Sequence, residues 1–164
     1  MIPEVLQNRQ NVYLKPGEIF WGNHNFSIST VLGSCIAICL WHPLKKIGGM
    51  CHIMMPEKGN TGDIKPNPRY ADDAVRILLE KIAENKTKPF EYVVKVFGGS
   101  SMIKFENDNP EINVAKLNIK SAKKLMMEHG FRISVKDVGG SDSRKIVFDL
   151  NNGDAWKKKV RANL

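Results

Sequence analysis

Short apolar stretches, flanked by glycine, proline or polar residues, recur along the chain and predict β-strands. The strongest candidates cover residues 26–32, 36–41 and 47–55. Residues 36–41 are apolar throughout and too few for a comfortable helix, so we expect a strand that is buried on both faces. Further strands are predicted at 12–14, 18–21, 92–97 and 131–138, and a terminal hairpin is predicted from 146–150 and 155–160.

Two segments have the periodicity of helices. In residues 71–83 apolar side chains recur at three- and four-residue spacing, and two aspartates in the first turn suit the positive end of a helix dipole. A second helix is predicted over 114–129, with Gly130 as its C-cap. The polar stretches 57–69 and 100–110 are predicted to be loops. Many strands with two helices inserted late indicate an α+β domain.

Composition bounds the class of protein. A chain of 164 residues with 42% hydrophobic residues can bury a core without disulfides or metals. We expect a flexible segment at residues 1–12 and one domain over 13–164. The longest apolar run is far shorter than the roughly 20 residues a bilayer needs, and no secretory signal pattern is present. Three cysteines, an odd number, suit a reducing compartment. A cytoplasmic protein without membrane insertion is therefore expected.

The net charge of +8 favours an acidic partner. The lysines are scattered, however, apart from a run at 157–159, and no nucleic-acid-binding motif or interleaved aromatic pattern accompanies them. A solvated basic surface is the simpler interpretation, so no nucleic-acid partner is predicted.

Cys35 and His52 are the candidate reactive pair. They lie 17 residues apart, on predicted neighbouring strands joined by a turn, which would bring thiol and imidazole side by side. A thiol that can attack as a thiolate and an imidazole that can hold or move its proton are the minimum that a thiolate nucleophile requires. The Gly33-Ser34 turn before the thiol would supply backbone N–H groups that lower its pKa and hold an oxyanion. From the residues alone, a buried structural cysteine is the commoner alternative.

A zinc site is the competing interpretation of the same residues. Its ligands would be Cys35, Cys39, Cys51 and His52, but adjacent residues on a strand point to opposite faces, and these spacings match no common zinc motif. Cys39 is about 13 Å from Cys35 by strand rise and is expected in the core. We therefore predict neither a metal nor another cofactor.

Several motifs, in order, resemble the CheD family of chemoreceptor glutamine deamidases. The resemblance covers residue 13 to the end of the chain. It rests on Lys15-Pro16-Gly17-Glu18, Leu32-Gly33-Ser34-Cys35, Gly48-Gly49-Met50-Cys51-His52, Met54-Met55-Pro56, Lys95-Val96-Phe97-Gly98-Gly99, Asn118, Asp137-Val138-Gly139-Gly140 and Arg144-Lys145. We interpret the later glycine pairs and Asn118 as structural or as walls of a cleft.

The resemblance implies a three-layer sandwich of helices against packed, mostly antiparallel or mixed β-sheets. It also implies hydrolysis of glutamine side chains to glutamate in methyl-accepting chemotaxis receptors, which tunes chemotaxis signalling and needs no cofactor. Cys35 would be the nucleophile and His52 the general base and acid, with Gly33 and Ser34 at the oxyanion or substrate cleft. A CheC-type phosphatase is a further candidate partner.

One residue departs from the family pattern. The resemblance assigns the orientation of the imidazole to a threonine six residues before the nucleophile, but that position is Ser29, with Thr30 next to it. The role is open between these two hydroxyls. The departure gives some weight to a second hypothesis, a non-catalytic or weakly catalytic module that docks on chemoreceptors or on a CheC-type phosphatase.

Overall fold

The computed structural model of the chain describes residues 9–62, 65–101 and 113–160. Its strands and helices, in chain order, are β1 (Gln10–Tyr13), β2 (Ile19–Asn23), β3 (Phe26–Leu32), β4 (Ile36–His42), β5 (Ile47–Ile53), α2 (Ala71–Glu84), the 3₁₀ turn η1 (Pro89–Glu91), β6 (Val93–Gly98), α3 (Val114–Glu128), β7 (Ile133–Val138), β8 (Ser143–Asp149) and β9 (Ala155–Val160). The predicted strands and both predicted helices are present, with shifts of a few residues at their ends.

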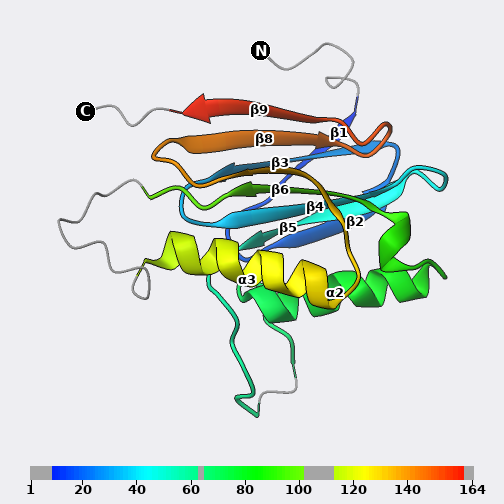
Figure 1. The fold of residues 1–164 in the computed structure, drawn as a ribbon. Coiled ribbons are helices and arrows are strands. Elements are labelled where there is room, and N and C mark those ends of the chain that lie inside the picture. The colour runs from blue at the N-terminus through cyan, green and yellow to red at the C-terminus, as the bar shows by residue number, and fades with distance from the viewer. Residues whose placement is uncertain (1–8, 63–64, 102–112, 161–164) are drawn as a thin grey trace.

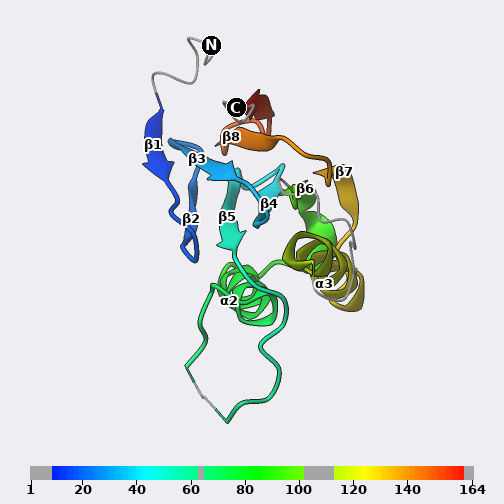
Figure 2. The same cartoon turned by 90° about the vertical axis from the view of Figure 1, so that its left-hand side faces the viewer.

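The strands form two mixed sheets. The outer sheet has the order β1-β3-β8-β9, and the central sheet has the order β2-β5-β4-β6-β7. Among the described strands, β1 pairs with β3 and β6 pairs with β7 in parallel, and the other pairings are antiparallel. Both helices cover the face of the central sheet that is turned away from the outer sheet (Figures 1 and 2). The α+β class and the three layers implied by the resemblance are confirmed.

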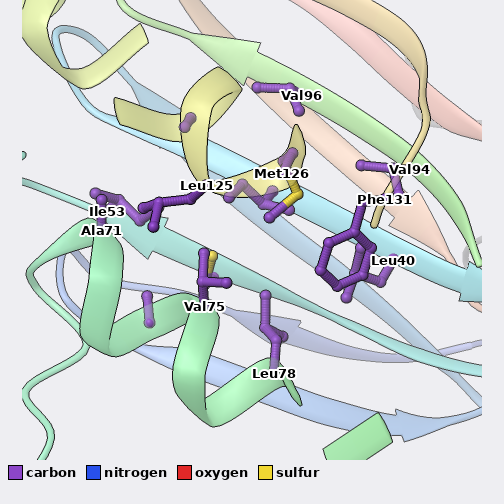
Figure 3. Packing of buried hydrophobic residues seen from close by; sticks show 14 of the residues in the cluster. Leu40, Ile53, Ala71, Val75, Leu78, Val94, Val96, Leu125, Met126 and Phe131 are labelled. Atoms are coloured by element: carbon purple, nitrogen blue, oxygen red, sulfur yellow. The ribbon is translucent and has the colours of Figure 1, made fainter. Parts of the chain in front are cut away.

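β4, the middle strand of the central sheet, is buried on both faces, as its apolar run predicts. Alternate residues Ile36, Ile38 and Leu40 contribute to the hydrophobic cluster beneath the helices. Figure 3 shows this cluster, with Val75 and Leu78 of α2 and Leu125 and Met126 of α3 turned toward the strands. The intervening residues Ala37 and Cys39 belong to a second cluster between the two sheets. A strand with no polar face has to be covered from both sides, and this requirement produces the three layers.

The N-terminal strand differs from the prediction. Residues 10–12, inside the segment predicted to be flexible, form most of β1 and pair with β3, Gln10 lying opposite Phe26. Residues 1–8 of that segment lie outside the described residues, as do 102–110 of the predicted loop 100–110 and the last four residues of the domain predicted over 13–164.

The predicted loop 57–69 lacks regular structure in its described part and is fastened to the start of α2. Asp72 accepts hydrogen bonds from the backbone N–H groups of Lys58 and Gly59, and Asp73 accepts one from Asn67. The two aspartates therefore hold the loop as well as lying in the first turn of the helix. Within the described residues, neither helix is long and apolar enough to cross a membrane.

Candidate active site

Cys35 and His52 lie on one face of the central sheet. His52 in β5 is the direct partner of Ala37 in β4, and Cys35 precedes Ala37 by two positions. Residues two positions apart share a strand face, and a diagonal cross-strand neighbour is within reach of a side chain. Cys35 packs against the hydrophobic cluster between the sheets, on the side where Ala37 lies. The antiparallel pairing of β4 and β5 thus makes the two predicted residues diagonal neighbours on that face.

Cys35 is the accessible one of the three cysteines. Cys35 is partly exposed and follows the exposed Ser34, whereas Cys39 and Cys51 are fully buried. The His52 side chain is buried, with 1% of its surface exposed. Cys35 is therefore open to solvent on the side of residues 33–35, which we call the Cys35 turn, whereas the imidazole of His52 is covered.

Thr30 determines which nitrogen of His52 carries the proton. Its hydroxyl oxygen lies 2.7 Å from Nδ1 of His52 and 2.8 Å from the carbonyl oxygen of Leu14. A carbonyl can only accept, so the single hydroxyl hydrogen goes to Leu14, and Nδ1 must be the donor to Thr30. The lone pair of a neutral ring then lies on Nε2, a buried nitrogen with no partner among the described residues. The ring is held in the tautomer of a general base.

Ser29 is not part of this arrangement. Consecutive residues of β3 point to opposite faces, so Thr30 faces the central sheet and Ser29 faces away from it. The Ser29 hydroxyl donates to Oδ1 of Asn11 at 2.9 Å. Of the two hydroxyls that the sequence leaves open, the one in contact with His52 is that of Thr30, whereas that of Ser29 contacts Asn11.

Burial keeps both reactive groups neutral at rest. It lowers the pKa of His52 to about 4, from 6.5, while the negative charge of Glu18 opposes the shift. Burial also raises the pKa of the Cys35 thiol. The lowered thiol pKa predicted from the sequence is therefore wrong, because burial disfavours the charged thiolate. At rest the site therefore holds a neutral thiol and a neutral imidazole.

The Cys35 turn is held by its carbonyl groups. Gly33, Ser34 and Cys35 accept hydrogen bonds from the N–H of Ser100 (2.8 Å), from Nδ2 of Asn118 (3.1 Å) and from the N–H of Gly99 (2.9 Å), respectively. Within the described part of the chain, nothing accepts a hydrogen bond from the N–H groups of Ser34 and Cys35. Two free, adjacent donors beside a thiol are the elements of an oxyanion hole.

The glycine pair after β6 makes this packing feasible. A Cβ atom on Gly98 would lie 2.1 Å from the carbonyl oxygen of Cys35, and one on Gly99 would lie 2.5 Å from the side chain of Ile119. Buried Arg144 donates to the Gly98 carbonyl (3.2 Å) and to the Ser100 hydroxyl (2.8 Å). The sequence marks these residues only as a turn, because their contact with the Cys35 turn is made across distant segments.

The four residues of the zinc alternative do not form one group. Cys51 lies in the cluster beneath the helices, and His52 faces the outer sheet through Thr30, as the strand parity predicts. In the described segments, no three His, Cys, Asp or Glu side chains are grouped so that they could hold a metal ion.

The chain matches one protein family along most of its length. Residues 54–159 match the family described as CheD chemotactic sensory transduction. A protein of Pseudomonas syringae pv. tomato named probable chemoreceptor glutamine deamidase CheD is 38% identical over 148 residues, 90% of this chain and 88% of the relative. An alignment of that length leaves out too few residues to exclude either Cys35 or His52.

Two further relatives agree. A protein with the same name from Pseudomonas savastanoi pv. phaseolicola is 41% identical over 147 residues, 88% of this chain and 82% of its own. A protein of Leptospira interrogans serovar copenhageni, named probable chemoreceptor glutamine deamidase CheD 1, is 35% identical over 156 residues, 91% of this chain and 92% of its own. Matches of this identity and extent go with a shared fold, so the chain belongs to the CheD family.

Proposed function

We propose that this chain hydrolyses glutamine side chains of chemoreceptors to glutamate, with Cys35 as nucleophile and His52 as general base and acid. The observation that carries the proposal is the imidazole, whose Nδ1 proton is held by Thr30 and whose free Nε2 lies on the face that also bears Cys35. The names of the relatives supply the substrate class.

In the first half of the reaction, Nε2 of His52 takes the thiol proton as the sulfur of Cys35 attacks the carboxamide carbon. Because both groups are neutral at rest, this transfer accompanies substrate binding and does not precede it. The N–H groups of Ser34 and Cys35 hold the oxyanion of the tetrahedral intermediate. The imidazolium then gives its proton to the departing nitrogen, ammonia leaves, and a thioester on Cys35 remains.

In the second half, Nε2 takes a proton from a water molecule, whose oxygen attacks the thioester carbon. The carbon–sulfur bond breaks, the glutamate carboxyl group is released, and the proton returns to the sulfur of Cys35. Thr30 accepts from Nδ1–H throughout, and the charge of Glu18 stabilises the imidazolium whenever it forms. No metal or cofactor enters the balance of this scheme.

The proposal places the reaction in the cytoplasm, on the helical bundle of methyl-accepting receptors. A new carboxylate there becomes a methylation site and alters signalling. A CheC-type phosphatase is the second partner that we propose on the resemblance to the family.

The test is incubation of the protein with a receptor cytoplasmic fragment, followed by peptide mass spectrometry. We expect selected glutamines to acquire the mass of glutamate with the natural protein and not with Cys35→Ala. Equal conversion by both proteins would remove Cys35 from the mechanism. Tight binding to the fragment without any conversion would favour the docking module instead.

A further inference from the structure

Asn118 is a polar residue of α3 on the helix face that packs against the central sheet, and 0% of its surface is exposed. Its amide nitrogen donates to two carbonyl oxygens, those of Ser34 and Met54, at 3.1 Å each. These two bonds use both amide hydrogens. Its oxygen, also buried, has no partner among the described residues. A buried amide oxygen without a partner costs stability. The two bonds that the amide nitrogen donates therefore explain why an asparagine lies here.

The bond to Ser34 determines the direction of a neighbouring N–H group. All peptide bonds of the described chain are trans, and in a trans peptide the carbonyl and the following N–H point in opposite directions. With the Ser34 carbonyl held toward α3, the N–H of Cys35 is directed away from α3, to the side where the thiol packs between the sheets. The bond from the Ser100 N–H to the Gly33 carbonyl orients the N–H of Ser34 in the same manner.

Among the three bonds that hold the Cys35 turn, only the one from Asn118 comes from a side chain. The bonds to Gly33 and Cys35 come from backbone N–H groups, which a substitution leaves in place. Asn118 also holds the carbonyl of Met54, two residues beyond His52. One amide therefore connects the nucleophile turn to the end of the strand that carries the base.

We propose that Asn118 is a positioning residue that preorganises the oxyanion hole of the Cys35 turn. This inference rests on the proposed deamidase function. Asn118 contacts neither substrate nor sulfur in this scheme, and it acts through the orientation of the Ser34–Cys35 peptide group. Its loss should slow steps that pass through a tetrahedral oxyanion and spare reactions of the same thiol that form none.

The experiment compares two reactions of Cys35. Deamidation of a receptor fragment forms an oxyanion, whereas alkylation by iodoacetamide displaces iodide at a saturated carbon and forms none. In Asn118→Leu, which keeps the branching at Cγ but removes both donors, we expect kcat to fall about 10- to 100-fold while KM stays within about threefold. We expect the alkylation rate of Cys35, located by mass spectrometry, to stay within about twofold of that of the natural protein.

The matched control is Met126→Ala, a cavity substitution on the same buried face of α3, in the cluster beneath the helices. It should lower stability and leave both rates unchanged below its melting temperature. Should Asn118→Leu fail to fold, Asn118→Ala, which leaves room for water, takes its place in the same comparison.

Two results would overturn the inference: an unchanged kcat in the folded Asn118 variant, or an alkylation rate that falls in parallel with kcat. The second would mean that Asn118 holds the thiol or the fold and not the N–H groups. Absence of Cys35-dependent deamidation in the natural protein is a separate result, which would remove the proposed function and this inference with it.

Discussion

Thr30→Val is the sharpest test of how His52 is oriented. Valine has nearly the shape of threonine but can neither donate to the Leu14 carbonyl nor accept from Nδ1 of His52. Both partners are left unpaired in a site where Thr30 has 0% of its surface exposed. At roughly 1–3 kcal/mol for each of these two buried groups, the free energy of unfolding should fall by about 2–6 kcal/mol. For a chain of this length, at roughly 2–4 °C per kcal/mol, that corresponds to a melting temperature lower by roughly 4–24 °C.

The catalytic effect should exceed what the loss of stability explains. In the variant, no group keeps the proton of a neutral His52 on Nδ1, and a ring protonated on Nε2 cannot accept the proton of the Cys35 thiol. We expect kcat to fall about 100-fold at a temperature where the variant is folded. Nitrogen chemical shifts of the His52 ring should report the change of tautomer directly.

The neighbouring residue provides the matched control. Ser29→Ala removes a hydroxyl from the same strand, but that hydroxyl bonds Asn11 on the opposite face. It should cost about 1 kcal/mol and leave kcat within twofold of the natural protein. Thr30→Ser, which keeps the hydroxyl, should restore most of the activity. If Thr30→Val folds and retains full kcat with an unchanged His52 tautomer, the role assigned to Thr30 is wrong.

Three further predictions follow from the site. His52 has a pKa of about 4 in the folded chain against 6.5 unperturbed, so the unfolded chain binds the extra proton between these values. The free energy of unfolding should therefore rise by about 3 kcal/mol as the pH rises from 4 to 6.5, a slope that urea titrations should find missing in His52→Gln. Gly98→Ala should destabilise the protein by more than about 2 kcal/mol, because Gly98 has a φ of +113° and an added Cβ would meet the Cys35 carbonyl. The control Gly59→Ala has a positive φ but open space around the added Cβ, so it should cost only about 1 kcal/mol. Glu18→Gln should lower the pKa of His52 further in an NMR titration, since the carboxylate favours the imidazolium, and an increase would contradict the assigned charge effect.

The sequence alone predicts the strands and helices, and it predicts that Cys35 and His52 lie on neighbouring strands. The continuous apolar run of β4, the three- and four-residue spacing in α2 and the glycine turn between the last strands are local patterns, and each element formed where its pattern lies. The spacing of Cys35 and His52 around a tight turn also implies antiparallel neighbours, because a short connection leaves the chain few alternatives.

Local patterns do not predict the contacts between the layers. Thr30 and His52 belong to different sheets, and which of two adjacent hydroxyls meets the ring depends on the face that β3 turns toward the central sheet. Asn118 reaches the Cys35 turn from a helix 84 positions further along the chain. The parallel pairing of β1 with β3 is likewise a matter of how distant segments meet.

The direction in which the pKa of the Cys35 thiol shifts also depends on the tertiary structure. A cysteine after a glycine turn and near a histidine suggests an activated thiolate, yet the sign of the shift depends on how much water the folded site excludes. Periodicity records which face of an element is buried, a property of neighbouring residues. Register between layers, access of solvent and the direction of a peptide group depend on residues far apart in sequence, so only the tertiary structure decides them.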